Sequence, residues 1–211
     1  MKLLCLANSY KEKGRCVAGV LLDEDNQPVI ENEKPIWIRP VYRDGHGQIP
    51  NNICEHVQPL DIIELKDAEI IGEGYQSENT TYDENRIVVI GKGDMELIND
   101  LYADTDLIFG NRGKAVNQDV IKDLDHSLII INTTDFEIFE KEYDGKKHPQ
   151  IRLKFNYRDK TYDFPITDPA FLKNYGQNKG ILDDKDNINL VLSLGIPLDD
   201  WHYKLVATVL Y

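Results

Sequence analysis

The chain has 211 residues, of which 41% are hydrophobic and 29% charged, a composition typical of folded proteins that argues against wholesale disorder. The length suits either one compact unit or two small barrels of about a hundred residues each, and needs no disulfide or metal to hold a core. The formal net charge is −13. That charge argues against a sequence-blind nucleic-acid binder, which depends on lysine and arginine to neutralise phosphates.

The charge is unevenly distributed along the chain. Residues 1–66 contain eight basic and ten acidic side chains, whereas residues 67–211 contain 16 basic and 27 acidic ones. Any contact with a polyanion must therefore be local, and the N-terminal part is the better candidate for it.

Three widely spaced cysteines, Cys5, Cys16 and Cys54, point to a reducing compartment, and we expect a cytoplasmic protein. Cys5 and Cys16 lie in apolar segments, where a free thiol usually acts as a small buried hydrophobe. The apolar run at residues 1–7 is too short for the core of a signal peptide, and no stretch approaches the ~20 apolar residues of a membrane span. We therefore expect a soluble protein with no membrane partner.

Strand-like segments dominate the N-terminal part. Their residue types and turn signals predict strands at 2–8, 15–22, 37–41, 59–65 and 86–91. The polar segment between the first two strands is turn-like. In the third, the two-residue period places Trp37, Arg39 and Val41 on one face.

Short helical patterns follow, and then strands return. Helices are predicted at 94–103, 117–124 and 168–176; the last has Asp168 at its cap, a proline in its first turn and a glycine at its end. Later strands are predicted at 128–132, 150–157, 161–166, 189–194 and 203–210, with 150–157 and 161–166 forming a hairpin. Because strands far outnumber helices and do not alternate with them, the pattern argues against a parallel α/β sheet.

The strands fall into two clusters, 1–91 and 127–211, separated by a helix-bearing segment at 92–126. This layout predicts a mainly β fold (a β-rich α+β protein) made of two small β-barrels and a helical connector. No tandem repeat or low-complexity segment interrupts it.

Metal and catalytic motifs are absent from the sequence. The five histidines are scattered and no C-x-x-C is present, so we expect no metal. The acidic run 183–186 lacks the rest of a calcium loop and is interpreted as a solvated loop. No nucleophile elbow, P-loop or dinucleotide fingerprint occurs, so no catalytic activity or cofactor is established. Segment 110–114 has glycines and cations that could let an anion approach, but its spacing does not match a Walker motif and we interpret it as an exposed linker.

The first candidate site is a cluster of amide, hydroxyl and cationic side chains in the N-terminal hairpin: Asn8, Ser9, Lys11, Lys13 and Arg15. Trp37 and Arg39 are expected in the same sheet. An aromatic surface beside arginine and amide groups suits stacking and hydrogen bonding to a base. The alternative is that Trp37 belongs to the core and the cations solvate a loop.

The second candidate is the C-terminal segment 201–207. There His202 and Lys204 fall on the face opposite Tyr203 and Leu205, from which both could project into a groove. The alternative is a structural or solvated histidine.

Several of these segments resemble a prokaryotic family described as the dual OB-containing domain. The resemblance rests on residues 2–9 (KLLCLANS), 14–19 (GRCVAG), 37–41 (WIRPV), 60–62 (LDI), 193–195 (SLG) and 202–207 (HYKLVA), which span the chain. It implies two OB-like barrels with a few short helices, and a binding rather than catalytic role in nucleic-acid processing or prokaryotic defence. The acidity departs from an OB module for single strands, which leaves open a polymer, a modified base or a small nucleotide as ligand.

Three hypotheses follow from these observations. The first is a non-catalytic binding module for nucleic acid or a nucleotide-like ligand, using Asn8, Ser9, Lys11, Arg15, Trp37, Arg39, His202 and Lys204. The second is an enzyme acting on a nucleotide or nucleobase, in which Asn8, Cys16, Asp163 and His202 converge. The third is a scaffold whose acidic C-terminal part binds a basic protein partner.

Overall fold

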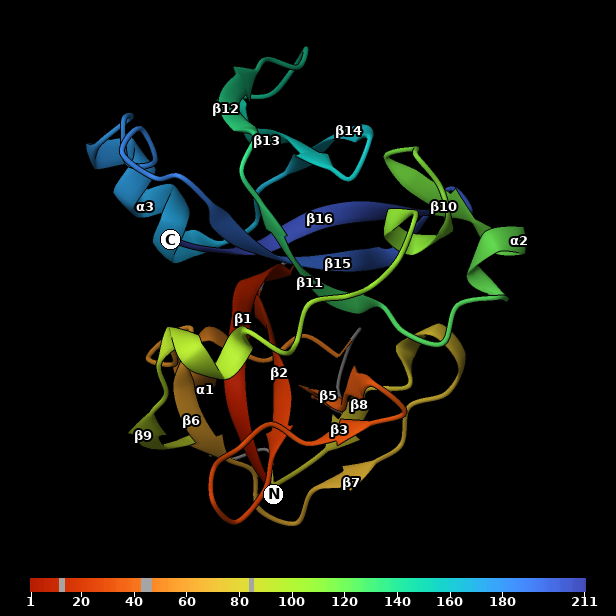
Figure 1. Cartoon of the computed structure of the whole chain (residues 1–211), viewed down its shortest axis with the longest axis vertical. Coiled ribbons are helices and arrows are strands. Elements are labelled where there is room, and N and C mark those ends of the chain that lie inside the picture. The colour runs from red at the N-terminus through yellow and green to blue at the C-terminus, as the bar shows by residue number, and fades with distance from the viewer. Residues whose placement is uncertain (12–13, 43–46, 84–85) are drawn as a thin grey trace. The chain divides into compact units, whose positions relative to one another are not determined.

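The computed structural model describes residues 1–11, 14–42, 47–83 and 86–211, and strands dominate it (Figure 1). The chain divides into two compact units. The first contains Met1–Ala103 and Asp125–Ser127, and the second contains Asp104–Leu124 and Leu128–Tyr211. The predicted mainly β fold with a few short helices is confirmed. The segment expected to connect the barrels, 92–126, contributes residues to both units.

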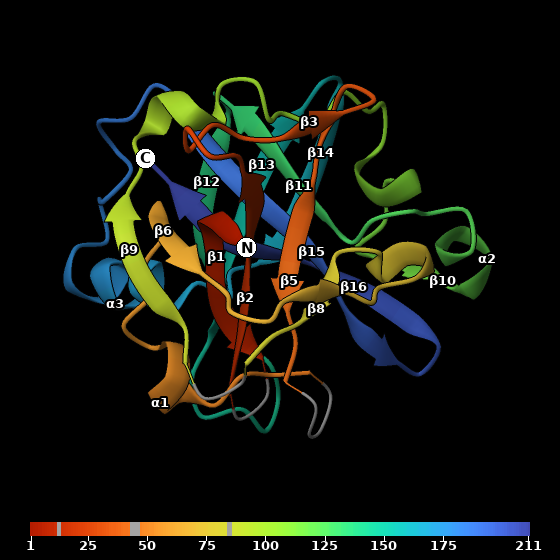
Figure 2. The ribbon, with the colours of Figure 1, turned by 90° about the horizontal axis from the view of Figure 1, so that it is seen from below.

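The first unit is built on a seven-stranded sheet with the order β7-β8-β5-β2-β1-β6-β9. Its strands are β1 (Lys2–Lys11), β2 (Gly14–Leu22), β5 (Trp37–Pro40), β6 (Asp61–Glu64), β7 (Glu69–Ile70), β8 (Asn79–Thr81) and β9 (Val88–Lys92). Figure 2 shows β6, β1, β2 and β5 side by side. The neighbours pair antiparallel except β5 and β8, which run parallel. A separate ribbon pairs β3 (Ile30–Glu31) with β4 (Lys34–Pro35).

The core of this unit forms on the face shared by alternate residues of β1, β2 and β6, such as Leu3, Val17 and Ile63, all fully buried. The short helix α1 (Asn51–Cys54) follows β5 and adds Cys54 to the same cluster. Two 3-10 turns complete the unit, η1 (Gly74–Gln76) and η2 (Met95–Ile98).

A β-bulge in β1 shifts the register between Cys5 and Ala7 and brings the two hairpin strands unusually close. A Cβ atom added to Gly19 would lie only 2.0 Å from the carbonyl oxygen of Leu4. The bulge therefore requires glycine at this position of β2.

The second unit contains two antiparallel sheets. One has the order β10-β16-β15-β11 and the other β12-β13-β14. Their bounds are β10 (Ala115–Asn117), β11 (Leu128–Thr133), β12 (Phe136–Lys141), β13 (Gln150–Tyr157), β14 (Lys160–Pro165), β15 (Ile188–Leu198) and β16 (Trp201–Leu210). The predicted hairpin is confirmed, because Tyr157 pairs with Lys160 across a turn in which Arg158 has φ 52°. Phe155, Tyr162 and Phe164 pack ring to ring, with centroids 5.5–5.7 Å apart.

The helices differ in how closely they match the prediction. α3 (Pro169–Gln177) is confirmed, and the Asp168 carboxylate accepts hydrogen bonds from the amides of Ala170 and Phe171 at 2.9 and 3.0 Å. The pattern at 94–103 gives only the 3-10 turn η2, and that at 117–124 gives only α2 (Gln118–Ile121); a third 3-10 turn, η3, covers Ile108–Gly110. Segments this short cannot recover the cost of helix nucleation unless packing supports them.

Candidate functional site

The end of the β1–β2 hairpin at which Lys11 pairs with Gly14 presents an aromatic ring with a cation stacked on it. Tyr10 pairs with Arg15 across the two strands. Tyr10 is 52% exposed, and the guanidinium carbon of Arg15 lies 4.6 Å from the centre of its ring. The Arg15 Nε donates a hydrogen bond of 3.1 Å to the Asn51 side-chain oxygen, which fixes the direction of the guanidinium. Within the described ranges, no residue bonds its two terminal nitrogens.

This pair is positioned by the buried part of the same face. Asn8 pairs with Val17, two residues further into the hairpin from Tyr10 and Arg15. The Asn8 amide donates hydrogen bonds of 2.8 Å to the carbonyls of Cys54 and Val57, which ties α1 to the hairpin. Asn8 is only 7% exposed and serves as a structural anchor for the Tyr10–Arg15 pair.

The other polar residues predicted in this hairpin are placed differently. Ser9 is 5% exposed and alternates to the face opposite Tyr10. Lys11 is half-buried at the last position of β1, and Lys13 lies outside the described residues. Burial raises the pKa of the Cys54 thiol to about 11, an effect that the nearby Arg15 partly opposes. Burial also holds the pKa of Cys5 far above its ordinary value, as expected for a thiol in a core.

Trp37 and Arg39 lie in the same sheet as the hairpin but do not join its exposed pair. Trp37 pairs with Val20, five positions along β2 from Arg15 and on the opposite face. The expectation that Trp37 and Arg39 share a face agrees with the strand alternation of β5. Trp37 is half-buried, whereas Arg39 is only 4% exposed.

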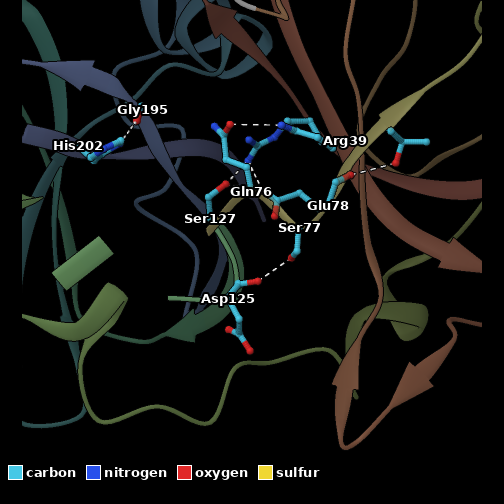
Figure 3. A network of polar contacts seen from close by, with 10 residues as sticks. Arg39, Gln76, Ser77, Glu78, Asp125, Ser127, Gly195 and His202 are labelled. Atoms are coloured by element: carbon cyan, nitrogen blue, oxygen red, sulfur yellow. Dashed lines mark hydrogen bonds and ion pairs between the residues drawn. The ribbon is translucent and has the colours of Figure 1, made fainter. Parts of the chain in front are cut away.

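Arg39 belongs to a buried ion-pair network (Figure 3). Its guanidinium lies 2.5 Å from a carboxylate oxygen of Glu78, and the Ser127 hydroxyl bonds with both groups. The two charged side chains are 5% and 2% exposed. The Ser77 hydroxyl donates to the carbonyl of Asp125 at 2.6 Å, so residues 125–127 are held at several points. Arg39 is therefore a structural residue of the first unit, contrary to its expected place in a ligand surface.

His202 and Lys204 do lie opposite Tyr203, but their face is the interior of the second unit and not an open groove. His202 is 1% exposed, with Nδ1 3.1 Å from the carbonyl oxygen of Gly195. Lys204 is fully buried, and its ammonium donates to the carbonyls of Ile108 and Asn111 at 2.6 and 2.7 Å. Burial lowers the pKa of Lys204 to about 7.

The glycine-containing segment 110–114 receives this lysine. The Asn111 side-chain oxygen accepts a third bond from Lys204, of 2.8 Å, and also accepts from the amide of Gly113. Lys114 pairs with Asp163 at 3.4 Å. Carbonyl oxygens directed at an ammonium make this turn an internal cation site, so the anion-binding interpretation has no support in its geometry.

The four residues of the enzyme hypothesis are divided between the units. Asn8 and Cys16 belong to the first unit, and Asp163 and His202 to the second. Asp163 is paired with Arg152 at 2.6 Å, and Asn8 and His202 have the internal bonds described above. In the part of the chain that the structure describes, no group of three or more His, Cys, Asp or Glu side chains could hold a metal ion.

Sequence reasoning assigned none of the exposed aromatic residues of the described ranges to a ligand surface; these are Tyr10, Tyr143, Trp201, Tyr203 and Tyr211. For Tyr10, the first strand was expected to end at residue 8, whereas β1 continues to Lys11 and pairs Tyr10 with Arg15. Trp201 and Tyr203 alternate with His202 and Lys204 in β16, and it is their face that is exposed. None of the described helices is long and apolar enough to cross a membrane.

Comparison with known proteins places the chain in a family. No curated protein matches it. Among solved structures, a murine DNA-binding protein bound to double-stranded DNA aligns with 100% of this chain and 97% of its own, at 7% identity and a TM-score of 0.32. A replication protein A heterotrimer bound to single-stranded DNA aligns with 92% of this chain and 44% of its own, at 11% identity and a TM-score of 0.36. Structural similarity at these TM-scores and identities gives no indication of the function of this chain. The dual OB-containing domain model matches residues 1–209, and the chain belongs to that family.

Proposed function

We propose that this protein is a non-catalytic module that binds single-stranded nucleic acid, and that the Tyr10–Arg15 pair makes the central contact. The observation that supports this most directly is the exposed Tyr10 ring with the Arg15 guanidinium 4.6 Å from its centre. An unpaired base stacks on such a surface, since every base offers a flat face to an aromatic ring or a guanidinium. Membership of an OB family supports the same class of ligand.

The charge distribution supports a small, local contact. Arg15 and Lys11 lie in the part of the sequence that is nearly neutral, whereas residues 67–211 have an excess of 11 acidic side chains (27 against 16). A long nucleic acid would be repelled by much of this chain, so binding relies on stacking and few phosphates. We therefore propose that the ligand is either a stretch of a few nucleotides within a single strand or a small nucleotide-like molecule. A nucleic-acid-processing or prokaryotic defence setting forms part of this proposal.

The proposal is tested by fluorescence anisotropy with a labelled single-stranded oligonucleotide and the full chain. Tyr10→Ala and Arg15→Ala should each weaken binding by about tenfold, because loss of one stacked base costs about 1–3 kcal/mol. Arg15→Ala should also reduce the slope of log K against log salt by about 0.7. Competition with a mononucleotide and with a duplex of the same sequence distinguishes a nucleotide ligand from a strand and from paired DNA.

A matched control is available in the second unit. Tyr143 is 42% exposed and has the Lys141 ammonium 5.2 Å from its ring centre, so Tyr143→Ala removes a similar cation-stacked tyrosine elsewhere. Arg86→Ala is the corresponding control for Arg15→Ala, because it also removes one positive charge from the first unit and Arg86 is exposed. Equal losses in Tyr10→Ala and Tyr143→Ala, or wild-type protein that binds no oligonucleotide or nucleotide at low salt, would disprove the proposal.

A further inference from the structure

The end of the β15–β16 hairpin displays a second exposed surface, of different chemistry. Leu198 pairs with Trp201 across the turn and is 61% exposed. Trp201 and Tyr203 are each 45% exposed, and alternation places them on the same face as Leu198. We call Leu198, Asp199, Asp200, Trp201 and Tyr203 the acidic–aromatic tip.

The tip is held rigidly by the opposite face of β16. His202 and Lys204 alternate with the two aromatic residues and are bonded inside the unit, so β16 cannot rotate to bury Trp201. On the outer face, β10 places only Asn117 beside Trp201 and Ala115 beside Tyr203. These neighbours are too small to cover the rings. Exposed Trp and Tyr on a fixed strand are the residues most often found at the centre of protein interfaces.

The two turn residues are aspartates in a backbone conformation that other residues adopt more readily. Asp199 and Asp200 have φ 48° and 67°, the left-handed pair of a two-residue hairpin turn that Asn-Gly occupies most readily. Neither carboxylate forms an ion pair or hydrogen bond within the described ranges. The turn therefore presents two unneutralised carboxylates beside the exposed ring of Trp201.

We propose that the acidic–aromatic tip is a docking surface for an arginine- and lysine-rich segment of a partner protein. Cations are attracted both to the carboxylates and to the faces of Trp and Tyr, and their apolar stems cover surface such as Leu198. The same two carboxylates repel phosphates, which separates this surface from the nucleic-acid contact at Tyr10 and Arg15. The tip thus adds a protein-binding activity to the second unit, independent of the proposed ligand of the first.

The test uses the full chain and a fluorescent peptide of alternating arginine and glycine as the probe. Asp199→Asn with Asp200→Gly removes both charges and installs the sequence that the turn favours, so the fold is retained. This variant and Trp201→Ala should each raise the Kd for the peptide by about fivefold or more. The chain has two tryptophans, so Trp37→Phe leaves Trp201 as the sole reporter, and its emission should change as peptide is added.

The control removes the same number of charges from another acidic loop of the second unit. Asp184 and Asp186 are exposed, and converting both to Asn should change the peptide Kd by less than about twofold. Equal weakening by the two charge-removing variants would reduce the effect to net charge and overturn the proposal. An unchanged Trp201 emission would also overturn it, as would loss of oligonucleotide binding without loss of peptide binding in Trp201→Ala.

Discussion

Each unit of this protein buries a cation that sequence reasoning assigned to a ligand surface, and the two units stabilise it in different ways. In the first, Arg39 faces the Glu78 carboxylate at 2.5 Å and shares the Ser127 hydroxyl with it. In the second, the acceptors that the described residues offer to Lys204 are neutral, the oxygens of Ile108 and Asn111, with the Tyr162 and Phe164 ring centres 5.9 Å away. A counter-charge and a set of carbonyl acceptors are therefore not equivalent partners for a buried cation: the carbonyls of Ile108 and Asn111 do not offset the burial that lowers the pKa of Lys204 to about 7.

The largest effect is expected when the counter-charge is removed. Glu78→Gln leaves the Arg39 guanidinium buried without its carboxylate, and we expect the free energy of unfolding to fall by about 3–5 kcal/mol. Replacing both partners, Arg39→Met with Glu78→Leu, should cost much less, because no charge is then left inside. Urea denaturation of the three proteins measures this, and a double variant as unstable as Glu78→Gln would contradict the ion-pair explanation.

A smaller effect is expected when the carbonyl-bound cation is removed. Lys204→Met keeps the apolar stem but leaves the carbonyls of Ile108 and Asn111 without their donor, at a cost of about 1–3 kcal/mol. Thermal denaturation should show a lower Tm, and proteolysis should increase first within segment 108–114. An unchanged Tm together with unchanged proteolysis would show that Lys204 does not hold this turn.

The pH dependence of stability gives a separate test of the buried Lys204. The pKa of Lys204 is about 7 in the folded chain and near its ordinary 10.5 when unfolded, so between these values the unfolded chain binds a proton that the folded chain lacks. The free energy of unfolding should therefore rise with pH through this window, by at most about 1.4 kcal/mol per pH unit. Below pH 7 the cost of burying the protonated Lys204 is fully present. Subtracting the pH profile of the free energy of unfolding of Lys204→Met from that of the wild-type chain isolates the slope due to Lys204. Parallel profiles of the two proteins would contradict the lowered pKa.

The smallest effect is expected at an exposed ion pair of the first unit, next to the Arg39–Glu78–Ser127 network. Lys34 pairs with Asp125 at 3.2 Å, but the side chains are 67% and 73% exposed. Lys34→Ala should therefore change the free energy of unfolding by less than about 1 kcal/mol, and raised salt should remove the difference. A loss as large as that in Glu78→Gln would mean that exposure is a poor guide to ion-pair strength in this unit.

Much of the fold was predictable because its signals are local. The hairpin of β13 and β14, the cap of α3 by Asp168, and the mainly β composition all depend on residues within a few positions of one another. The separation of His202 and Lys204 from Tyr203 followed from the two-residue period of a strand. The candidate site stays a prediction; the structure places Arg15 beside the exposed Tyr10 ring, whereas Asn8 and Arg39 are buried and bonded inside the first unit.

The sequence by itself therefore determined which side chains share a face, and the tertiary structure decided which face is open. Alternation defines two faces of a strand equally well, and in β1 and β16 residues of both faces are buried. What covers a face comes from distant segments: Ser127 bonds Arg39 from 88 residues away, and Ile108 accepts from Lys204 across 96 residues. Such contacts leave no periodic trace near either partner, because burial is a property of the packed chain. For that reason the open aromatic residues, Tyr10 and Trp201, emerged only with the fold.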